Sequence, residues 1–358
     1  MSVHFEKIIV KEIRKETADC VSLVFDIPPI HKEAFRFKQG QHLTLRTFIN
    51  GEELRRSYSL CSSPLENEWR VAVKKQEAGI FSSYANQELK AGDTIELIPP
   101  LGHFFTEINI AHKKNYIAFA AGSGITPVLS LIKTILAAEP YSSFTLVYGN
   151  RNRSSIIFRE ALEALKNRYM ERFSIIHILS REMTDAEINH GRIDAAKCSM
   201  LFEKLISPDA DEFFICGPEQ MIFTVKEYLE KKGAEEKKIH FELFTPSVLK
   251  HATANVKHEK EEEGRKCKAT IRMDGIFFDV DVDFGGDSIL DAALFHGMDL
   301  PYSCKGGVCC TCKARLLEGK VEMDAYYGLE EDEVRQGYIL TCQSHPKTEK
   351  VVIDFDIK

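Results

Sequence analysis

The segment Leu300–Cys312 reads Leu-Pro-Tyr-Ser-Cys-Lys-Gly-Gly-Val-Cys-Cys-Thr-Cys and contains four of the ten cysteines of this 358-residue chain. Three of these four, Cys304, Cys309 and Cys312, follow a C-x4-C-x2-C spacing, and 29 residues separate the last of them from Cys342. A small inorganic cluster with four thiolate ligands fits this pattern, because three thiols can come from one tight loop and the fourth from a distant segment that folds back.

This spacing indicates a plant-type [2Fe–2S] cluster. Gly306 and Gly307 lie inside the loop, where glycine permits a positive φ and lets backbone N–H groups point toward cluster sulfurs. A structural zinc ion is the alternative, but zinc sites usually pair two C-x2-C units, and only one is present. The loop resembles that of plant-type ferredoxins, and the resemblance, over roughly residues 266–358, implies a β-grasp fold. Ferredoxins carry Gly, Ala or Ser where this chain has Cys310, whose role the sequence leaves open.

The composition narrows the class of protein. The chain is long enough for two or three domains, and its 44% hydrophobic and 28% charged residues are ordinary for a folded protein. A formal net charge of −7 disfavours nucleic acid as a partner. No apolar run reaches the ~18–20 residues that cross a bilayer, and the first residues have no signal-peptide core, so we expect no membrane partner and a cytoplasmic location.

The rhythm of short apolar runs changes along the chain and predicts a multidomain protein of mixed α+β and α/β class. We expect an antiparallel β-barrel over residues 1–110 and a parallel α/β domain over 111–245, and the family resemblance of the motifs described below implies flavin binding by the first and nicotinamide binding by the second. A linker over 246–264, which includes a charged aperiodic run, precedes the β-grasp ferredoxin domain at 265–358. A solvated helix is the alternative for this run. Expected strands are 20–25, 42–45, 69–73, 116–120, 144–148, 174–179 and 212–216, and a helix is expected at 127–138.

A cluster that takes one electron at a time cannot accept a hydride, so we looked for a flavin site. Arg56-Ser57-Tyr58-Ser59 resembles the R-x-Y-[ST] signature of the ferredoxin–NADP reductase family. The resemblance implies that Arg56 binds the flavin diphosphate, that Tyr58 lies against the isoalloxazine or ribityl region and that Ser59 hydrogen-bonds near flavin N5. Gly79–Tyr84 resembles the family's pyrophosphate-binding G-x-x-S segment. The overall resemblance is to members that bind FAD, and it therefore implies FAD rather than FMN. The residues alone leave this choice open. The candidate flavin residues are Arg56, Ser57, Tyr58, Ser59, Gly79, Phe81, Ser82 and Ser83.

The candidate nucleotide site begins at Gly122–Pro127, which follows an expected strand and opens a helix. Its glycines permit close approach of a pyrophosphate, and proline suits a first helical turn. The segment resembles the G-x-G-x-[TS]-P of the same family, and Cys216-Gly217-Pro218 resembles its C-G-P motif, which implies that Cys216 lies near nicotinamide C4. The candidate residues here are Gly122, Gly124, Thr126, Pro127, Cys216, Gly217 and Pro218.

Three further assignments come from the same resemblance. Ser180-Arg181 ends an expected strand, where relatives bind the 2′-phosphate of NADPH, and a guanidinium suits a phosphate; NADH stays possible. Phe244 is expected to cover the flavin until nicotinamide displaces it, and Glu242 to serve proton traffic at N5. The candidate catalytic residues are therefore Ser59, Cys216, Glu242 and Phe244.

The order of barrel, nicotinamide domain and ferredoxin resembles the family of reductase components of phenylacetyl-CoA epoxidases, especially at Ile239–Phe244 and Gly328–Gln343. The resemblance implies an NAD(P)H-dependent oxidoreductase that passes electrons from NADPH through FAD and [2Fe–2S] to a di-iron oxygenase in aerobic phenylacetate degradation. Another hydroxylase, a desaturase or a hybrid-cluster protein remains open as acceptor. A flavin and iron–sulfur redox-sensing module is the alternative from another class.

Overall fold

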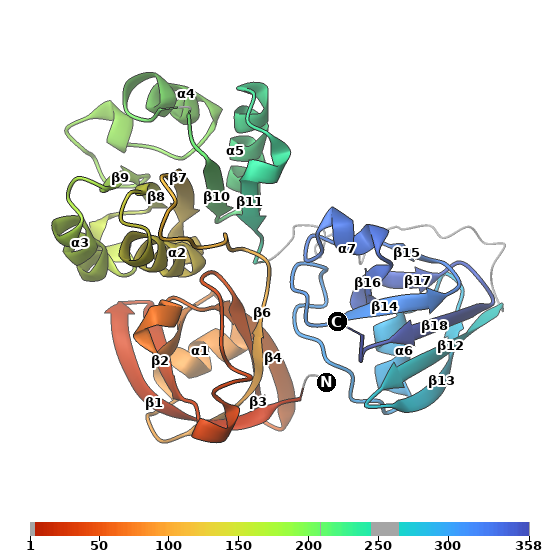
Figure 1. The fold of residues 1–358 in the computed structure, drawn as a ribbon. Helices are drawn as coiled ribbons and strands as arrows, with labels where there is room; N and C mark the ends of the chain where they lie inside the picture. Colours follow the sequence, from red (N-terminus) through yellow and green to blue (C-terminus); the bar gives the residue numbers. More distant parts are fainter. Residues whose placement is uncertain (1–3, 208, 245–264, 358) are drawn as a thin grey trace.

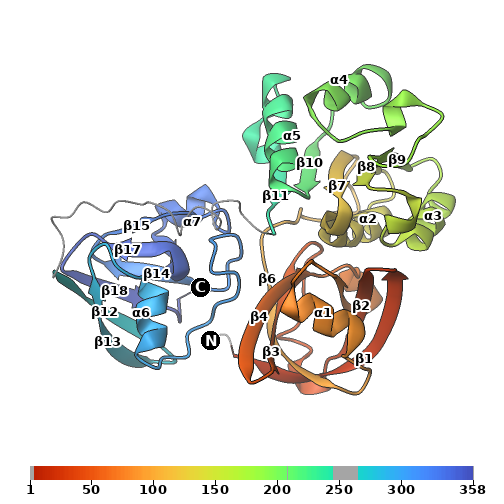
Figure 2. The same ribbon diagram turned by 180° about the vertical axis from the view of Figure 1, so that it is seen from behind.

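Three large sheets and a two-stranded sheet of β15 (Val321–Met323) and β17 (Ser344–Pro346) make up the protein, which we describe from a computed structural model at residues 4–207, 209–244 and 265–357 (Figure 1). The parallel sheet lies above the first sheet, and the third lies to one side of it; the reverse view shows the same arrangement (Figure 2). No helix among the described residues is long and apolar enough to cross a membrane. The predicted linker at 246–264 lies outside the described residues, and the predicted domain boundaries remain predictions.

The first sheet is antiparallel throughout, with the strand order β4-β3-β6-β1-β2-β5. A bridge between Leu60 and Val71 joins its two edges, so the sheet curls into the expected barrel. Alternating side chains such as Leu43 and Leu45 fill its interior. Its elements are β1 (Glu6–Thr17), β2 (Cys20–Asp26), β3 (His42–Ile49), β4 (Glu52–Ser59), β5 (Trp69–Lys74), α1 (Ile80–Gln87) and β6 (Thr94–Leu101).

The second sheet is parallel, with the strand order β11-β10-β7-β8-β9. Its central strands are almost entirely buried, as helices on the faces of a parallel sheet require. Helix α2 belongs to the largest buried core of the chain and is nearly free of charge. The elements are β7 (Asn115–Ala121), α2 (Ile125–Ala138), β8 (Ser143–Asn150), α3 (Arg159–Arg168), β9 (Phe173–Leu179), α4 (Ala195–Lys204), β10 (Glu212–Cys216), α5 (Glu219–Lys231) and β11 (Ile239–Glu242).

The third sheet is mixed, with the order β13-β12-β18-β14-β16 and a parallel pairing of β12 with β18. Ser288 caps helix α6 by accepting from Asp291 N–H, and the helix packs its apolar side on this sheet. This is the expected β-grasp arrangement. The elements are β12 (Lys266–Met273), β13 (Ile276–Asp283), α6 (Ile289–Phe295), β14 (Lys313–Glu318), β15 (Val321–Met323), α7 (Glu331–Arg335), β16 (Tyr338–Leu340), β17 (Ser344–Pro346) and β18 (Lys350–Asp354).

The strands expected from the sequence are all present, and 212–216 has the predicted bounds. The helix expected at 127–138 instead begins at Ile125, because a 3-10 turn at Gly122–Gly124 leads directly into it. Pro127 is accommodated because the first turn of a helix leaves N–H groups without helical partners. The described 3-10 turns are Pro29–His31, Pro64–Glu66, Gly122–Gly124, Arg153–Ser155, Glu187–Asn189, Glu236–Lys238 and Thr341–Gln343.

Candidate functional site

The carboxyl ends of the parallel strands bring the predicted nicotinamide residues together. Strand β10 ends at Cys216, which lies beside Glu242 of β11 on one side and pairs with β7 on the other. The glycine turn 122–124 follows β7 directly, and Gly217 and Pro218 lead from β10 into α5. The strand order reverses between β7 and β10, and open α/β sheets bind ligands at such a switch point.

Glycine is required at this switch point for two different reasons. A Cβ on Gly124 would lie 2.1 Å from the carbonyl oxygen of Cys216, so only glycine lets the turn approach β10 this closely. Gly122 has a φ of +55°, which side chains disfavour. Thr126 and Pro127 are buried in the first turn of α2. The resulting turn at a helix N-terminus fits the pyrophosphate of a nucleotide.

The end of β9 presents the predicted phosphate-binding pair. Ser180 donates both its N–H and its hydroxyl to the carbonyl of Asn150, at 2.9 and 3.3 Å. The side chain of Arg181 is exposed at this edge of the sheet. A neighbouring cation, Arg153, is already paired with Glu182 at 3.2 Å. Of these two cations, Arg181 is therefore the one without an ion pair in the described structure.

Strand β4 places the predicted flavin residues in different surroundings. Arg56 is exposed, and its guanidinium donates to the carbonyl of Arg55 at 2.7 Å, which leaves it able to reach a diphosphate. Tyr58 packs against Phe81 with ring centroids 5.5 Å apart, and burial raises the pKa of its phenol. The Ser57 hydroxyl, in contrast, donates to Ser303 in the third sheet's domain at 2.9 Å.

The loop before α1 is braced by its own side chains. Ser82 accepts from Gln76 N–H at 3.0 Å and donates to the Gly79 carbonyl at 3.1 Å, so its hydroxyl already has partners in the loop. A Cβ on Gly79 would lie 2.4 Å from that hydroxyl oxygen. Ser83 is half-buried in the first turn of α1, where N–H groups favour an anion. Ser82 thus shapes the loop, and Ser83 is better placed to face a phosphate.

A hydrogen bond joins the barrel to the parallel sheet beside these residues. Ser59 donates to Glu242 at 2.9 Å, and His42 Nδ1 lies 4.0 Å from the other carboxylate oxygen. Burial raises the pKa of Glu242 to about 8, and the hydrogen bond from Ser59 offsets part of this effect. Burial, with a smaller contribution from His103, lowers the pKa of His42 to about 4. At neutral pH the pair is therefore a protonated carboxyl beside a neutral imidazole.

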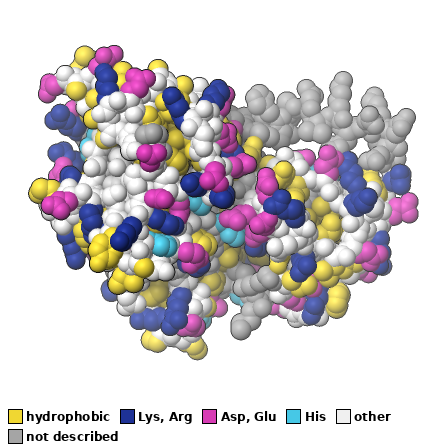
Figure 3. Space-filling model, turned by 45° about the horizontal axis from the view of Figure 1, so that its top comes forward, with side chains coloured by type: hydrophobic (Ala, Val, Ile, Leu, Met, Phe, Trp, Pro, Cys, Tyr) yellow, Lys and Arg dark blue, Asp and Glu magenta, His cyan; other side chains and the backbone are white. Residues whose placement is uncertain are grey.

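A cleft of about 630 Å³ opens next to this pair, and residues from all three domains line it, including His42, Glu242 and Cys310. Histidine and acidic side chains gather where the lobes of the molecule meet (Figure 3). Phe244 lies two residues beyond Glu242 and is 39% exposed. Cys216 is fully buried, and burial and then Glu242 raise the pKa of its thiol.

The four predicted ligand cysteines form two pairs. The Cys309 thiol donates to Cys304 Sγ at 3.2 Å, and the backbone N–H groups of Gly306 and Cys309 also point at that sulfur, at 3.3 and 3.4 Å. A hydrogen bond to Cys342, followed by burial, raises the pKa of Cys312. Two pairs of thiols fit a two-iron cluster in which each iron takes two of them.

Hydrogen bonds hold the distant ligand segment beside the cysteine loop. Thr341 donates its N–H and its hydroxyl to the Cys312 carbonyl, at 3.2 and 3.1 Å, and so holds the distant segment in place. Cys310 is buried in the same loop, and burial raises its pKa to about 12, so it is a neutral thiol.

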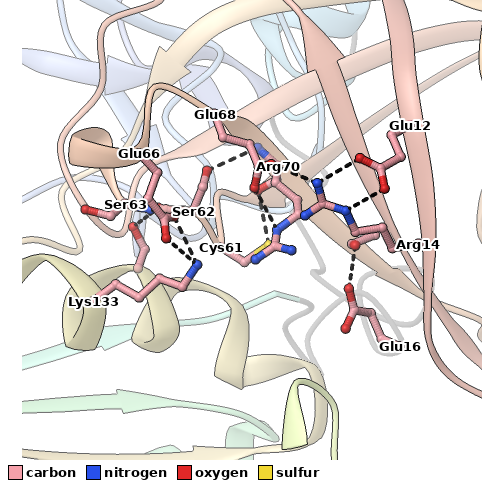
Figure 4. A network of polar contacts seen from close by, with 12 residues as sticks. Glu12, Arg14, Glu16, Cys61, Ser62, Ser63, Glu66, Glu68, Arg70 and Lys133 are labelled. Carbon is pink, nitrogen blue, oxygen red and sulfur yellow. Dashed lines mark hydrogen bonds and ion pairs between the residues drawn. The ribbon is translucent and has the colours of Figure 1, made fainter. Parts of the chain in front are cut away.

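Polar contacts join the barrel to helix α2 of the parallel-sheet domain (Figure 4). Lys133 of α2 binds both oxygens of Glu66, at 2.8 and 3.0 Å. Ser130 donates to the carbonyl of Ser62 at 2.6 Å, and both groups are buried. These contacts join helix α2, which begins at the switch point of the parallel sheet, to the barrel segment that follows β4.

One residue of this site was not among the predicted site residues. His42 begins an expected strand, but only the antiparallel pairing of β3 with β4 places it opposite Ser59. Its imidazole Nε2 is buried and has no hydrogen-bond partner among the described residues.

Three known families match successive parts of the chain. Residues 7–106 match the oxidoreductase FAD-binding domain, residues 119–227 the oxidoreductase NAD-binding domain and residues 271–347 the 2Fe-2S iron-sulfur cluster binding domain. FAD is thus favoured over FMN, as expected, and the cluster family supports iron and sulfide over zinc.

Curated relatives match the chain over nearly its whole length. It is 45% identical over 99% of its residues to one component of the 1,2-phenylacetyl-CoA epoxidase of Escherichia coli K12, and the match covers 98% of that component. It is 33% identical over 97% to the ferredoxin reductase component of the 3-ketosteroid-9-alpha-monooxygenase of Rhodococcus rhodochrous, covering 95% of that protein.

Among solved structures, phthalate dioxygenase reductase matches with a TM-score of 0.59, 24% identity and 98% of each chain. An intact type IV self-sufficient cytochrome P450 monooxygenase matches with a TM-score of 0.70 and 20% identity, over 98% of this chain and 41% of the other. At these identities the likeness shows the fold alone.

Proposed function

This chain belongs to the family of FAD- and [2Fe–2S]-containing reductase components of multicomponent oxygenases, and we propose that its acceptor is a di-iron oxygenase that epoxidises phenylacetyl-CoA in aerobic phenylacetate degradation. The observation that carries this choice is the 45% identity over 99% of the chain with a component of such an epoxidase. Electron transfer from a pyridine nucleotide is common to the family; the acceptor is the proposal.

The barrel residues would hold FAD. Arg56 supplies a free guanidinium for the diphosphate, α1 offers N–H groups and the Ser83 hydroxyl, and Tyr58 and Phe81 provide an aromatic wall. When bound, FAD takes two electrons as a hydride from the nicotinamide, and the cluster carries them onward singly. The residues of the chain bind and orient these groups and keep water away from them.

Ser59 and Glu242 would handle the proton at the flavin. Once Glu242 has released its own proton, the Ser59 oxygen can take a proton and pass its hydroxyl proton to the Glu242 carboxylate, since the hydroxyl already donates to that group at 2.9 Å. A pKa of about 8 lets Glu242 hold or release a proton near neutral pH. The adjoining cleft then gives that proton a route to solvent.

The switch point would bind the nucleotide. Gly122 and Gly124 admit its pyrophosphate, and Cys216 lies at the strand end where the nicotinamide is expected. We propose that NADPH is preferred to NADH, because the exposed Arg181 is available for a 2′-phosphate whereas Arg153 is neutralised by Glu182. Phe244 is proposed to cover the flavin face when nicotinamide is absent.

The cysteine pairs would each hold one iron, Cys304 with Cys309 and Cys312 with Cys342. We propose the domain division of the sequence prediction, at 1–110, 111–245 and 265–358 with a linker at 246–264. We also propose the cytoplasm as the compartment, because all ten cysteines are free thiols here and thiols persist in reducing surroundings.

A second candidate acceptor is another oxygenase. Reductase components of the 3-ketosteroid and glycine betaine monooxygenases match this chain at 29–33% identity over at least 90% of its length, so one domain order serves several acceptors. The redox-sensing alternative predicts no rapid turnover, and NADPH-driven bleaching of flavin and cluster absorbance would exclude it.

The test is NADPH consumption with phenylacetyl-CoA and the purified oxygenase components of the epoxidase, each component being omitted in turn. The proposal predicts oxidation coupled to epoxide formation only in the complete mixture. If NADPH reduces a dye or a cytochrome but no epoxide forms with an active oxygenase, the reductase function stands and the phenylacetyl-CoA assignment is wrong.

A further inference from the structure

Strand β4 carries two adjacent arginines with opposite surroundings. Successive residues of a strand point to opposite faces of the sheet, so Arg55 and Arg56 leave the barrel in different directions. Arg56 is exposed beside the flavin motif, whereas the Arg55 side chain is only 4% exposed. A buried guanidinium must be paired and hydrogen-bonded to be tolerated, so its partners show what it does.

The partners of Arg55 lie on both sides of a domain contact. Its Nη1 donates to the carbonyl of Leu300 at 3.0 Å and its Nη2 to Asp299 at 2.6 Å, both in the segment that leads into the cysteine loop. Its Nε donates to Glu53 of its own strand at 2.6 Å. The guanidinium also lies over the ring of Tyr302, 4.1 Å from the centroid. The planar fork of arginine matches such a set of partners, and a lysine ammonium does not.

Smaller contacts continue this interface along the cluster loop. Ser57 donates to Ser303 at 2.9 Å, and Ser303 directly precedes the ligand Cys304. Thr44 lies 3.1 Å from Thr311, which directly precedes the ligand Cys312. The barrel therefore contacts the loop immediately beside two of the three ligand cysteines that the loop carries. These hydroxyl pairs align the barrel strands with the cysteine loop. The Arg55 guanidinium supplies the strongest hydrogen bonds of the contact, because its bonds are charge-assisted.

We propose that Arg55 is a positioning residue that fastens the cluster loop to the strand carrying the flavin motif, and so sets the separation of the two redox groups. The inference rests on the family function of electron transfer and not on the identity of the acceptor. The two adjacent arginines have different roles, because Arg56 faces the proposed flavin site and Arg55 binds the segment that leads into the cysteine loop. Neither Arg55 nor Asp299 belongs to any of the sequence motifs.

Arg55→Ala removes the fork and leaves the Leu300 carbonyl without its donor, whereas Glu53 and Asp299 keep Arg46 nearby, at 3.7 and 3.3 Å. Because the Asp299 side chain is 68% exposed, we expect the loss of these charge-assisted hydrogen bonds to weaken the interface by roughly 10-fold. Arg55→Lys keeps the charge but cannot reproduce the planar set of bonds to Glu53, Asp299 and the Leu300 carbonyl, so it should recover only part of the loss. Arg36→Ala is the matched control, because Arg36 pairs with Glu33 on the barrel surface and both side chains are more than 75% exposed.

Two readouts on the full-length holoprotein test the proposal. Amide hydrogen exchange over residues 299–304 reports docking of the loop, and its protection should fall roughly 10-fold in Arg55→Ala and remain unchanged in Arg36→Ala. Anaerobic stopped-flow absorbance after mixing with NADPH separates flavin reduction from cluster reduction. Flavin reduction should stay as in the wild type, while cluster reduction slows by about tenfold or more, with an intermediate rate in Arg55→Lys.

Unchanged protection of residues 299–304, or lost protection with a wild-type rate of cluster reduction, would overturn the positioning role. If Arg55→Ala loses its FAD or iron, Arg55→Lys carries the same comparison, and wild-type exchange and rates in that variant overturn the role of the fork. Failure of NADPH to reduce the flavin of the wild type would instead count against the reductase function, so the two failures are distinguishable.

Discussion

Gly124→Ala should disable the nucleotide site through a single steric contact. The new Cβ would lie 2.1 Å from the Cys216 carbonyl oxygen, 2.5 Å from its carbon and 2.9 Å from Gly217 N. Real Cβ contacts essentially never fall below 3.0 Å, so the strand end must move by about 0.9 Å, the difference between 3.0 and 2.1 Å. The backbone φ of −61° at Gly124 suits alanine, so no conformational strain adds to the clash.

The magnitude follows from this displacement. Overpacking a well-packed site costs ~1–3 kcal/mol of stability, and a misplacement of ~1 Å near reacting groups can cost about 100-fold in rate. We expect flavin reduction at saturating NADPH to slow by about 100-fold, measured by anaerobic stopped flow at the flavin absorbance. Cluster content, from iron analysis, should stay unchanged because the third sheet is not involved.

Gly122→Ala is the matched control. It introduces an alanine at φ +55°, which costs ~1–2 kcal/mol, but meets no atom within 4 Å. It should therefore lower stability and, because Gly122 also borders the pyrophosphate site, raise the KM for NADPH. It should not move Cys216, so the rate of flavin reduction at saturating NADPH should change little. A wild-type rate in Gly124→Ala, or equal losses of rate in both variants, would refute the reasoning that close approach to Cys216 is what this glycine provides.

Three further outcomes are expected. Cys342→Ala removes one of the four paired thiols, so cluster absorbance and iron should be lost while NADPH still reduces the flavin; a full cluster in this variant would point to Cys310 as a substitute ligand. Arg181→Ala should raise the KM for NADPH by roughly 10-fold to 100-fold, the worth of a charge-assisted hydrogen bond, and leave the KM for NADH nearly unchanged; equal effects on both nucleotides would argue against a 2′-phosphate contact. Glu242 has a folded-state pKa raised to about 8, so the folded protein retains a proton that the unfolded chain releases near pH 4.5. The free energy of unfolding of the wild type, relative to that of Glu242→Gln, should therefore fall as the pH rises from about 4.5 to about 8. Urea unfolding at several pH values measures this difference, and a difference that stays constant would contradict the raised pKa.

The chemistry of the chain could be predicted from sequence where it depends on residues close together. The cysteine spacing and the two glycine motifs are local patterns, because a loop that wraps a cluster or a turn that admits a phosphate is built within about a dozen residues. Strand periodicity and the switch to helical spacing near residue 115 are local as well, so the order of barrel and parallel sheet followed from them. The β-grasp fold was implied by the resemblance of the cysteine loop to that of ferredoxins. Glu242 was placed beside the flavin only through the resemblance to relatives.

Other features depend on contacts between segments far apart in the sequence, and only the tertiary structure decided them. The hydroxyls of Ser57 and Ser82 were both candidates for the flavin, yet one meets the ferredoxin loop and the other braces its own loop. No spacing marks Arg55 or His42, whose partners lie on other strands or another domain. The sequence by itself determined the redox groups and the strands that carry them, because those follow from short-range geometry. The packing of the three sheets decided which side chains meet between them, because a buried charge or hydroxyl takes its role from whichever partner the folded chain places within hydrogen-bond reach.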